Sequence, residues 1–200
     1  MSLDPRTRAR RQLLALGALF LVAPGAALLL YFGLPQLIPR HTTNRGQLLS
    51  PARPLPPLQL SDARGGGAAG RPFSDHWNLV VAGDGPCLQE CRTLLTTLRN
   101  LREVLRSDRP RVTVWYVTAD EADARTLQPL FDAGPLHVIN LRVDHGARGA
   151  RLADVLTPAT PGSVYLIDPL GNWMMRYPPG TPPLDIYEDL KHLLRYSQIG

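Results

Sequence analysis

The chain has only two cysteines among its 200 residues, and only one of its 22 basic residues is a lysine. Two cysteines exclude a small disulfide scaffold, which needs several bridges in place of a hydrophobic core. We interpret the shortage of lysine as a codon bias. Positive charge is also scarce where a folded domain is expected, because residues 71–200 carry a net charge of −1 while residues 1–70 carry +6. That balance excludes a nucleic-acid binder, whose folded surface needs a basic stripe.

Charged residues are missing altogether from residues 13–34, a run of 22 apolar or small residues. About 20 such residues cross a bilayer as a helix, so we expect a single transmembrane helix in contact with membrane lipid. Four arginines lie just before the run, and the positive-inside rule then keeps residues 1–12 in the cytoplasm and the chain after residue 40 outside it. The expected location is the inner (cytoplasmic) membrane. A cleaved signal peptide and a buried core helix are the alternatives, and the apolar residues beyond Gly25 and the lack of a polar face argue against them.

Prolines and glycines crowd residues 35–70, which hold six prolines and a run of three glycines. Such a composition predicts an extended, partly stiff linker that buries no core. We therefore expect residues 71–200 to fold as one domain that this linker holds away from the bilayer.

Short apolar runs alternate with stretches of helical periodicity in residues 71–200. Strands are predicted at 77–82, 112–118, 137–143, 163–168 and 173–177, and helices at 87–105, 119–132, 151–156 and 181–196. Strands that alternate with helices form a parallel sheet, and a turn at 169–172 makes the last two strands an antiparallel hairpin. This order matches a thioredoxin-like α/β domain.

The two cysteines, Cys87 and Cys91, lie between the first predicted strand and the first helix of this domain. Helix positions four apart share a face, and their Cα separation of roughly 6 Å permits a disulfide. A helix N-terminus favours an anion, so we expect Cys87 to be the attacking thiolate and Cys91 to be the more buried, resolving thiol. Such a pair can cycle between dithiol and disulfide or hold Cu(I). The structural alternatives are a static staple, worth only about 2 kcal/mol for so short a loop, and two inert buried thiols.

From residue 78 onwards the chain resembles the SCO/SenC family of membrane-tethered cytochrome c oxidase assembly factors. The resemblance rests on the strand that leads into Cys87-x-x-x-Cys91, on the strand at 112–118, and on the sequence Tyr-Leu-Ile-Asp-Pro-Leu-Gly at 165–171. It implies a thioredoxin-like fold, copper as a cofactor, and a cytochrome c oxidase subunit or another copper-site assembly factor as the partner. In that family two cysteines and one downstream histidine bind copper. Thr160 stands at the position of that histidine, so the resemblance implies a branch in which Cys87 and Cys91 hold only Cu(I), and transiently.

Other candidate site residues carry weaker signals. Asp84, close to the cysteines, is a candidate proton relay, although a turn residue explains it more simply. Pro161 precedes the fourth predicted strand, where thioredoxin-like folds place a cis-proline that faces the dithiol, and a plain loop proline is the alternative. His145 is a candidate replacement ligand, with a solvated loop histidine as the simpler interpretation. Met174 and Met175 point to opposite faces of a strand, so we do not expect both to bind one copper ion.

Three functions stay open at this point. The first is an assembly factor that reduces or remodels the copper-site thiols of a terminal oxidase, the second a general exported thiol-disulfide oxidoreductase, and the third a tethered scaffold without catalysis. The usual thioredoxin motif has two residues between its cysteines, whereas three separate Cys87 from Cys91, which favours the first. The missing histidine keeps the third open.

Overall fold

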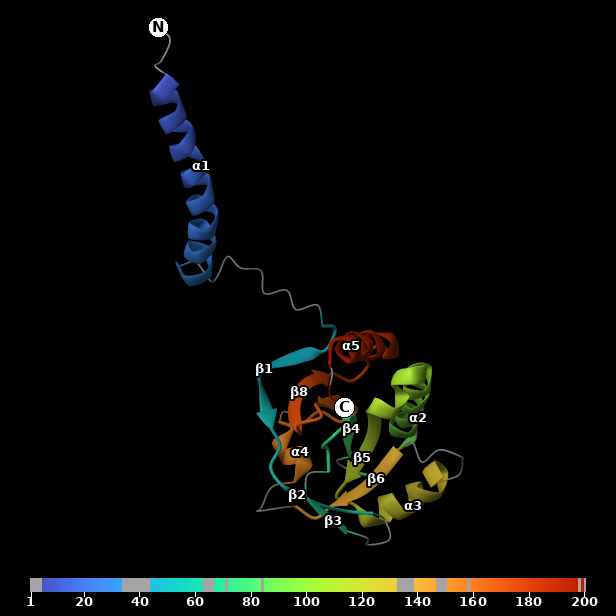
Figure 1. The fold of residues 1–200 in the computed structure, drawn as a ribbon. Coiled ribbons are helices and arrows are strands. Elements are labelled where there is room, and N and C mark those ends of the chain that lie inside the picture. The colour runs from blue at the N-terminus through green and yellow to red at the C-terminus, as the bar shows by residue number, and fades with distance from the viewer. Residues whose placement is uncertain are drawn as a thin grey trace. The chain divides into compact units, whose positions relative to one another are not determined.

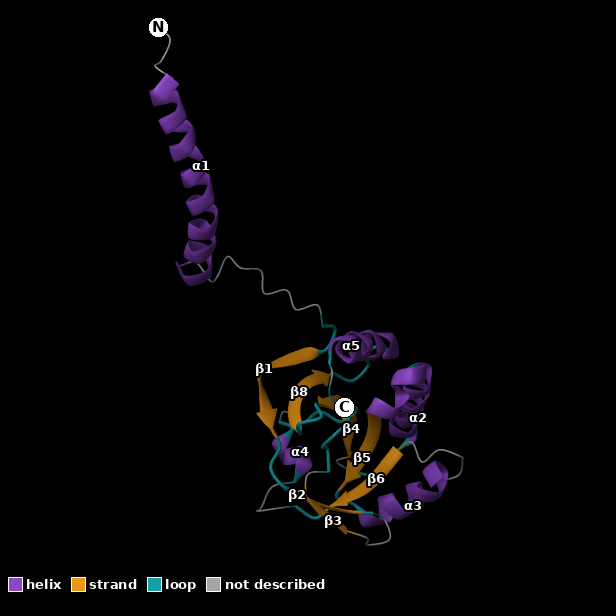
Figure 2. Cartoon of the chain, viewed as in Figure 1, coloured by secondary structure: helices purple, strands orange, loops and turns teal. Residues whose placement is uncertain are grey.

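The computed structural model describes residues 5–33, 44–62, 67–70, 72–83, 85–132, 139–146, 151–157, 159–197 and 199. It divides the chain into two compact units, Met1–Thr43 and Asn44–Gly200. Figure 1 and Figure 2 show their helices and strands.

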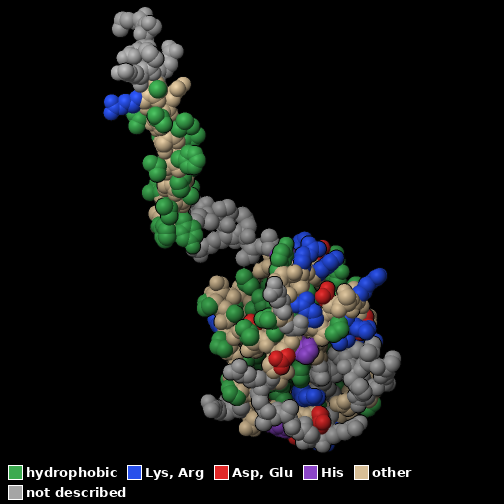
Figure 3. Space-filling model, viewed as in Figure 1, with side chains coloured by type: hydrophobic (Ala, Val, Ile, Leu, Met, Phe, Trp, Pro, Cys, Tyr) green, Lys and Arg blue, Asp and Glu red, His purple; other side chains and the backbone are tan. Residues whose placement is uncertain are grey.

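The first unit contains helix α1 (Pro5–Leu28), which continues as a π-helical turn over Leu29–Gly33. Within Ala9–Gly33 a window of 18 residues has a mean hydropathy of 2.4, and the segment buries no side chain within the protein. Hydrophobic side chains line the visible length of this helix in Figure 3. The chain therefore has the predicted helix, long and apolar enough to cross a membrane.

The second unit is built on one eight-stranded sheet with the order β1-β8-β7-β4-β5-β6-β2-β3. Its strands are β1 (Gln47–Pro54), β2 (Leu58–Ser61), β3 (Gly67–Gly70), β4 (Trp77–Gly83), β5 (Val112–Thr118), β6 (Ile139–Asp144), β7 (Val164–Ile167) and β8 (Asn172–Tyr177). Strands β4, β5 and β6 run parallel, and the β7–β8 hairpin joins β4 antiparallel. The predicted thioredoxin-like α/β class is confirmed.

Three helices share one hydrophobic core on one face of this sheet, and a short helix packs on the other face. The first three are α2 (Gln89–Val104), α3 (Glu121–Asp132) and α5 (Pro183–Tyr196), the short one is α4 (Leu152–Val155), and the 3-10 helix η3 (Arg106–Arg111) connects α2 to β5. Helix α2 buries Leu95, Leu98 and Leu101, three residues apart, against the sheet. This stripe fixes the orientation of α2 and thereby of its first turn, which carries the site.

Strands β1, β2 and β3, which lie within residues 47–70, belong to the sheet, and this corrects the linker predicted over 35–70. Strand β1 pairs with β8, and β2 lies between β6 and β3. Leu58 and Leu60 are each only 2% exposed, so this segment buries apolar side chains despite its prolines. Prolines fit in β1 because it is an edge strand. A proline there can point its nitrogen away from the sheet, so no hydrogen bond between strands is lost. Residues 35–43 of the predicted linker lie outside the described residues.

Candidate redox site

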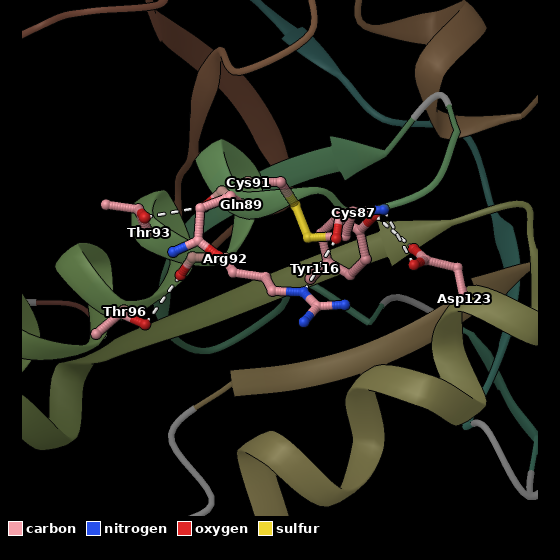
Figure 4. The surroundings of a disulfide bond; sticks show 8 residues. All are labelled: Cys87, Gln89, Cys91, Arg92, Thr93, Thr96, Tyr116 and Asp123. Carbon is pink, nitrogen blue, oxygen red and sulfur yellow. Dashed lines mark hydrogen bonds between the residues drawn. A yellow bond between two sulfur atoms is a disulfide. The ribbon is translucent and has the colours of Figure 1, made fainter.

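The cysteine pair lies where strand β4 leads into helix α2 (Figure 4). A disulfide joins Cys87 to Cys91, and the two Cα atoms are 5.2 Å apart. Cys87 precedes the helix, which begins at Gln89, and is 3% exposed. Cys91 lies in the first helical turn and is only partly buried. The predicted order of burial is therefore wrong, because the non-helical stretch before α2 turns Cys87 towards the core while the first turn leaves Cys91 nearer the surface.

A buried carboxylate holds the main chain at Cys87. The N–H of Cys87 donates to Oδ1 of Asp123 at 3.0 Å, and the hydroxyl of Tyr116 donates to Oδ2 at 2.9 Å (Figure 4). Asp123 is 8% exposed and lies in the first turn of α3. The sequence analysis missed this residue. Its position just after β5 was a usable signal, because the carboxyl ends of neighbouring parallel strands meet at one edge of the sheet.

Tyr116, on β5, is fully buried next to the cysteines. Burial raises the pKa of its phenol, and the hydrogen bond to Asp123 and the charge of that carboxylate raise it further. Gly83 leaves the room that the phenol needs, because a Cβ at that position would collide with the Tyr116 hydroxyl. The phenol therefore stays protonated at neutral pH and keeps donating to Asp123.

An arginine stands beside the disulfide. Nε of Arg92 donates to the carbonyl oxygen of Cys87 at 3.1 Å (Figure 4). This positive charge and the N-terminal end of α2 both favour a thiolate over a neutral thiol when the bond is reduced. The site is thus equipped to cycle between a disulfide and a dithiol with one ionised sulfur.

Two hollows lie against the pair. Both cysteines line a cavity of about 220 Å³, together with Tyr116. A groove of about 380 Å³ shares part of that lining and reaches Cys91 without reaching Cys87. We call it the proline groove, and it lies between the start of α2 (Leu88, Cys91, Leu94) and two Pro-Gly pairs at 161–162 and 179–180.

Pro161 lines both hollows, and the peptide bond before it is trans, as in a plain loop proline and unlike the cis-proline of thioredoxin-like folds. Pro161 and Gly162 are the central residues of a turn that the N–H of Ser163 closes on the carbonyl oxygen of Thr160 at 3.0 Å. Gly162 has a φ of +80°, and a proline followed by such a glycine forms a type II turn. Thr160, the predicted position of the lost histidine, is exposed and begins this turn.

The remaining candidates do not gather at the cysteines. Asp84 lies outside the described residues. The ring of His145 is hydrogen-bonded to Oγ of Ser61 at 2.6 Å. Ser61 ends β2 and His145 follows β6, and β5 lies between these strands and β4. Met175 is fully buried in the core, and Met174 is partly buried against it. Within the described ranges no three His, Cys, Asp or Glu side chains come together as a metal site, so the two cysteines are the candidate copper ligands there.

The family of transmembrane-like, thioredoxin-like C-terminal domains matches residues 77–197, which include the site and most of the sheet. The chain belongs to this family. No curated protein sequence matches this chain.

Solved structures with the same fold include several Sco proteins. The apo Sco1 protein from Thermus thermophilus is 19% identical, with 78% of this chain and 99% of that chain covered and a TM-score of 0.56. BsSco, described as having a disulfide switch, is 16% identical over 76% and 98% of the two chains, with a TM-score of 0.54. Yeast Sco1 with copper bound is 14% identical over 71% and 92%, also with a TM-score of 0.54. The predicted resemblance to SCO/SenC proteins is confirmed at the level of the fold.

Proposed function

We propose that this chain is a membrane-anchored assembly factor for cytochrome c oxidase that acts by thiol-disulfide exchange at Cys87 and Cys91. The disulfide at the start of α2, beside an open groove, carries the proposal. BsSco, which shares the fold, is a member of a family of cytochrome c oxidase assembly proteins and has a disulfide switch. The partner we propose is an oxidase subunit or another copper-site assembly factor whose cysteines exchange with this disulfide.

Copper is the second part of the proposal, as cargo. Yeast Sco1 has been solved with copper bound, and Cu(I) is a soft ion that two thiolates can hold. Thr160 offers no imidazole nitrogen, which Cu(II) favours. Cys87 and Cys91, once reduced, are therefore suited to a brief hold on Cu(I) and poorly suited to Cu(II).

The proposed arrangement in the membrane follows from charge. Four arginines precede the apolar helix, so residues 1–12 stay in the cytoplasm and the thioredoxin-like domain lies outside it, at the inner membrane. Such a compartment is oxidising and supports a disulfide.

The deciding experiment replaces both cysteines in cells that depend on the oxidase. The double variant Cys87→Ser/Cys91→Ser should lose most oxidase activity at an unchanged level of the protein, while the matched surface variant Ser107→Ala should keep it. Recovery on added copper would assign the role to copper delivery, and recovery on an added mixture of reduced and oxidised glutathione would assign it to exchange. A double variant with full oxidase activity would overturn both roles and leave a non-catalytic scaffold.

A further inference from the structure

The two halves of the disulfide are unequally accessible. Cys87 is 3% exposed, packs in the core, and has its N–H on the Asp123 carboxylate. Cys91 is partly exposed and is the half that lines the proline groove. A thiol that arrives along the groove therefore meets Cys91.

One wall of the proline groove consists of two rigid turns. The turn at 160–163 is matched by a second at 178–181, which the N–H of Thr181 closes on the carbonyl oxygen of Pro178 at 3.2 Å. Gly162 and Gly180 have φ values of +80° and +79°, so both turns have the Pro-Gly centre of type II. The turns also lie against each other, because a Cβ on Gly162 would lie 3.6 Å from Pro179. Two fixed proline rings thus form one wall of the groove. Because this wall is already ordered, binding of a partner costs little conformational entropy there.

The opposite wall is apolar and carries one negative charge. Leu88 is 70% exposed and Leu94 is partly buried, both on the groove side of α2. Among the described residues that line the groove, Glu90 is the only charged one. An occupant that buries apolar side chains and has no acidic residue of its own suits this surface.

We propose that a target protein docks an apolar, non-acidic segment bearing a cysteine in the proline groove and that its thiolate attacks Sγ of Cys91. This inference rests on the proposed exchange function and names its substrate class and its point of attack. The incoming sulfur forms a bond to the Cys91 sulfur while the bond between Cys91 and Cys87 breaks, and Cys87 departs with the electron pair as a thiolate. The incoming thiol has lost its proton to solvent, and one disulfide has replaced another. The departing Cys87 thiolate lies before the N-terminus of α2 and next to Arg92, where negative charge is favoured.

The test uses the full chain in detergent, as the reduced single variants Cys87→Ser and Cys91→Ser. Each is mixed with the disulfide-linked dimer of the tripeptide amide Leu-Cys-Leu, or with hydroxyethyl disulfide, and mixed-disulfide formation is followed by mass spectrometry. The rate with the peptide disulfide, divided by the rate with hydroxyethyl disulfide, corrects for the different intrinsic reactivities of the two thiols. We expect this ratio to be about tenfold higher for Cys87→Ser, which retains Cys91, than for Cys91→Ser. An equal or reversed ratio overturns the proposed point of attack.

The groove is tested separately with a matched pair of leucines. Leu88→Asp in the Cys87→Ser background should lower the ratio of the peptide rate to the hydroxyethyl rate several-fold. Leu184→Asp places the same charge on another exposed leucine, 62% exposed and outside the groove, and should change neither rate. Equal effects of the two substitutions overturn the docking site. These measurements use purified protein and so test the docking proposal separately from the proposed function. The docking proposal can be wrong while the cysteines are essential for the oxidase in cells, and it can be right while the oxidase does not depend on them.

Discussion

The carboxylate of Asp123 is hydrogen-bonded to the main chain of Cys87, 36 residues earlier in the sequence, at 3.0 Å. The bond ties the first turn of α3 to the segment that presents the disulfide. The second oxygen of the same carboxylate accepts the hydroxyl of Tyr116, so neither oxygen of this buried group is left without a donor. The position of Cys87 therefore depends on a group in another helix.

Removal of the Asp123 carboxylate should destabilise the domain. Asp123→Ala leaves the Cys87 N–H and the Tyr116 hydroxyl without their acceptor, and we expect a loss of about 1–3 kcal/mol in the free energy of unfolding. Asp123→Asn retains an acceptor oxygen and should lose less. Glu121→Ala, which removes an exposed ion pair with Arg125, is the control and should change little. Thermal unfolding followed by near-UV circular dichroism measures all three, and an equal stability of Asp123→Ala and Glu121→Ala would contradict the role of this bond.

Two buried tyrosines should make the domain sensitive to alkali. Burial and the neighbouring carboxylates raise the pKa of Tyr116 and Tyr177 above the ordinary value of about 10. The unfolded chain therefore releases these two protons at a lower pH than the folded chain, so their contribution to stability is complete below pH ~10 and is lost as the pH rises beyond it. We expect each tyrosine to add a decline of about 1.4 kcal/mol per pH unit in that range.

Denaturant titrations between about pH 9 and pH 11.5 measure this decline, and the range brackets the ordinary tyrosine pKa. Tyr116→Phe and Tyr177→Phe should each remove one share of it. Tyr196→Phe changes a tyrosine that is 70% exposed and should leave the profile as it is. The same profile in all three variants would show that the buried phenols ionise as easily as exposed ones.

A methyl group at position 83 should displace the Tyr116 phenol. Because a Cβ on Gly83 would collide with that hydroxyl, Gly83→Ala should cost about 1–3 kcal/mol in the free energy of unfolding. Tyr116→Phe removes the hydroxyl and should restore part of this loss in the double variant. A double-mutant cycle measures the coupling, and strictly additive losses would show that the two groups do not meet.

Copper binding should respond to a histidine at position 160. The reduced full-length chain is expected to bind at most one Cu(I) and to retain little Cu(II) on a desalting column. Thr160→His adds an imidazole at the start of the turn beside the cysteines and should raise Cu(II) retention. Thr157→His, also at an exposed threonine, is the control. No gain over this control would mean that Thr160 does not occupy the place of the lost ligand.

The orientation in the membrane can be tested with a fusion. A reporter that is active only outside the cytoplasm, joined after Gly200, should be active. Replacement of the four arginines at positions 6–11 by glutamine should reduce that activity, because the positive-inside rule then no longer fixes the N-terminus. Activity of a strictly cytoplasmic reporter at the same place would overturn the proposed location.

Local patterns in the sequence were enough for most elements after residue 77. The apolar run predicted as a strand at 77–82 is β4, and the leucines at helical spacing predicted as a helix over 87–105 form α2. These segments carry their own signal, because each buries one continuous run or one stripe of side chains. Strands β1, β2 and β3 carry no such signal. Strand β1 becomes a strand only through pairing with β8, β2 through pairing with β6, and β3 through pairing with β2.

The same division applies to the site. Cys87 and Cys91 are four residues apart, so their pairing follows from local geometry. Asp123 and the turn at 160–163 reach the site only through the order of strands in the sheet, which the spacing of residues along the chain does not express. The relative burial of the cysteines was predicted wrongly for a related reason, because depth along a helix says nothing about what packs against its first turn.

Because Cys87 and Cys91 are only four residues apart, reduction of their disulfide should have little effect on the folding of the domain. Opening the bond releases a loop confined to the start of α2, and the leucine stripe that seats this helix on the sheet does not involve it. The unfolded chain gains little freedom from so small a loop, so oxidised and reduced domains should differ little in stability. The proposed redox cycle can thus repeat many times while the sheet and its buried carboxylates stay as they are.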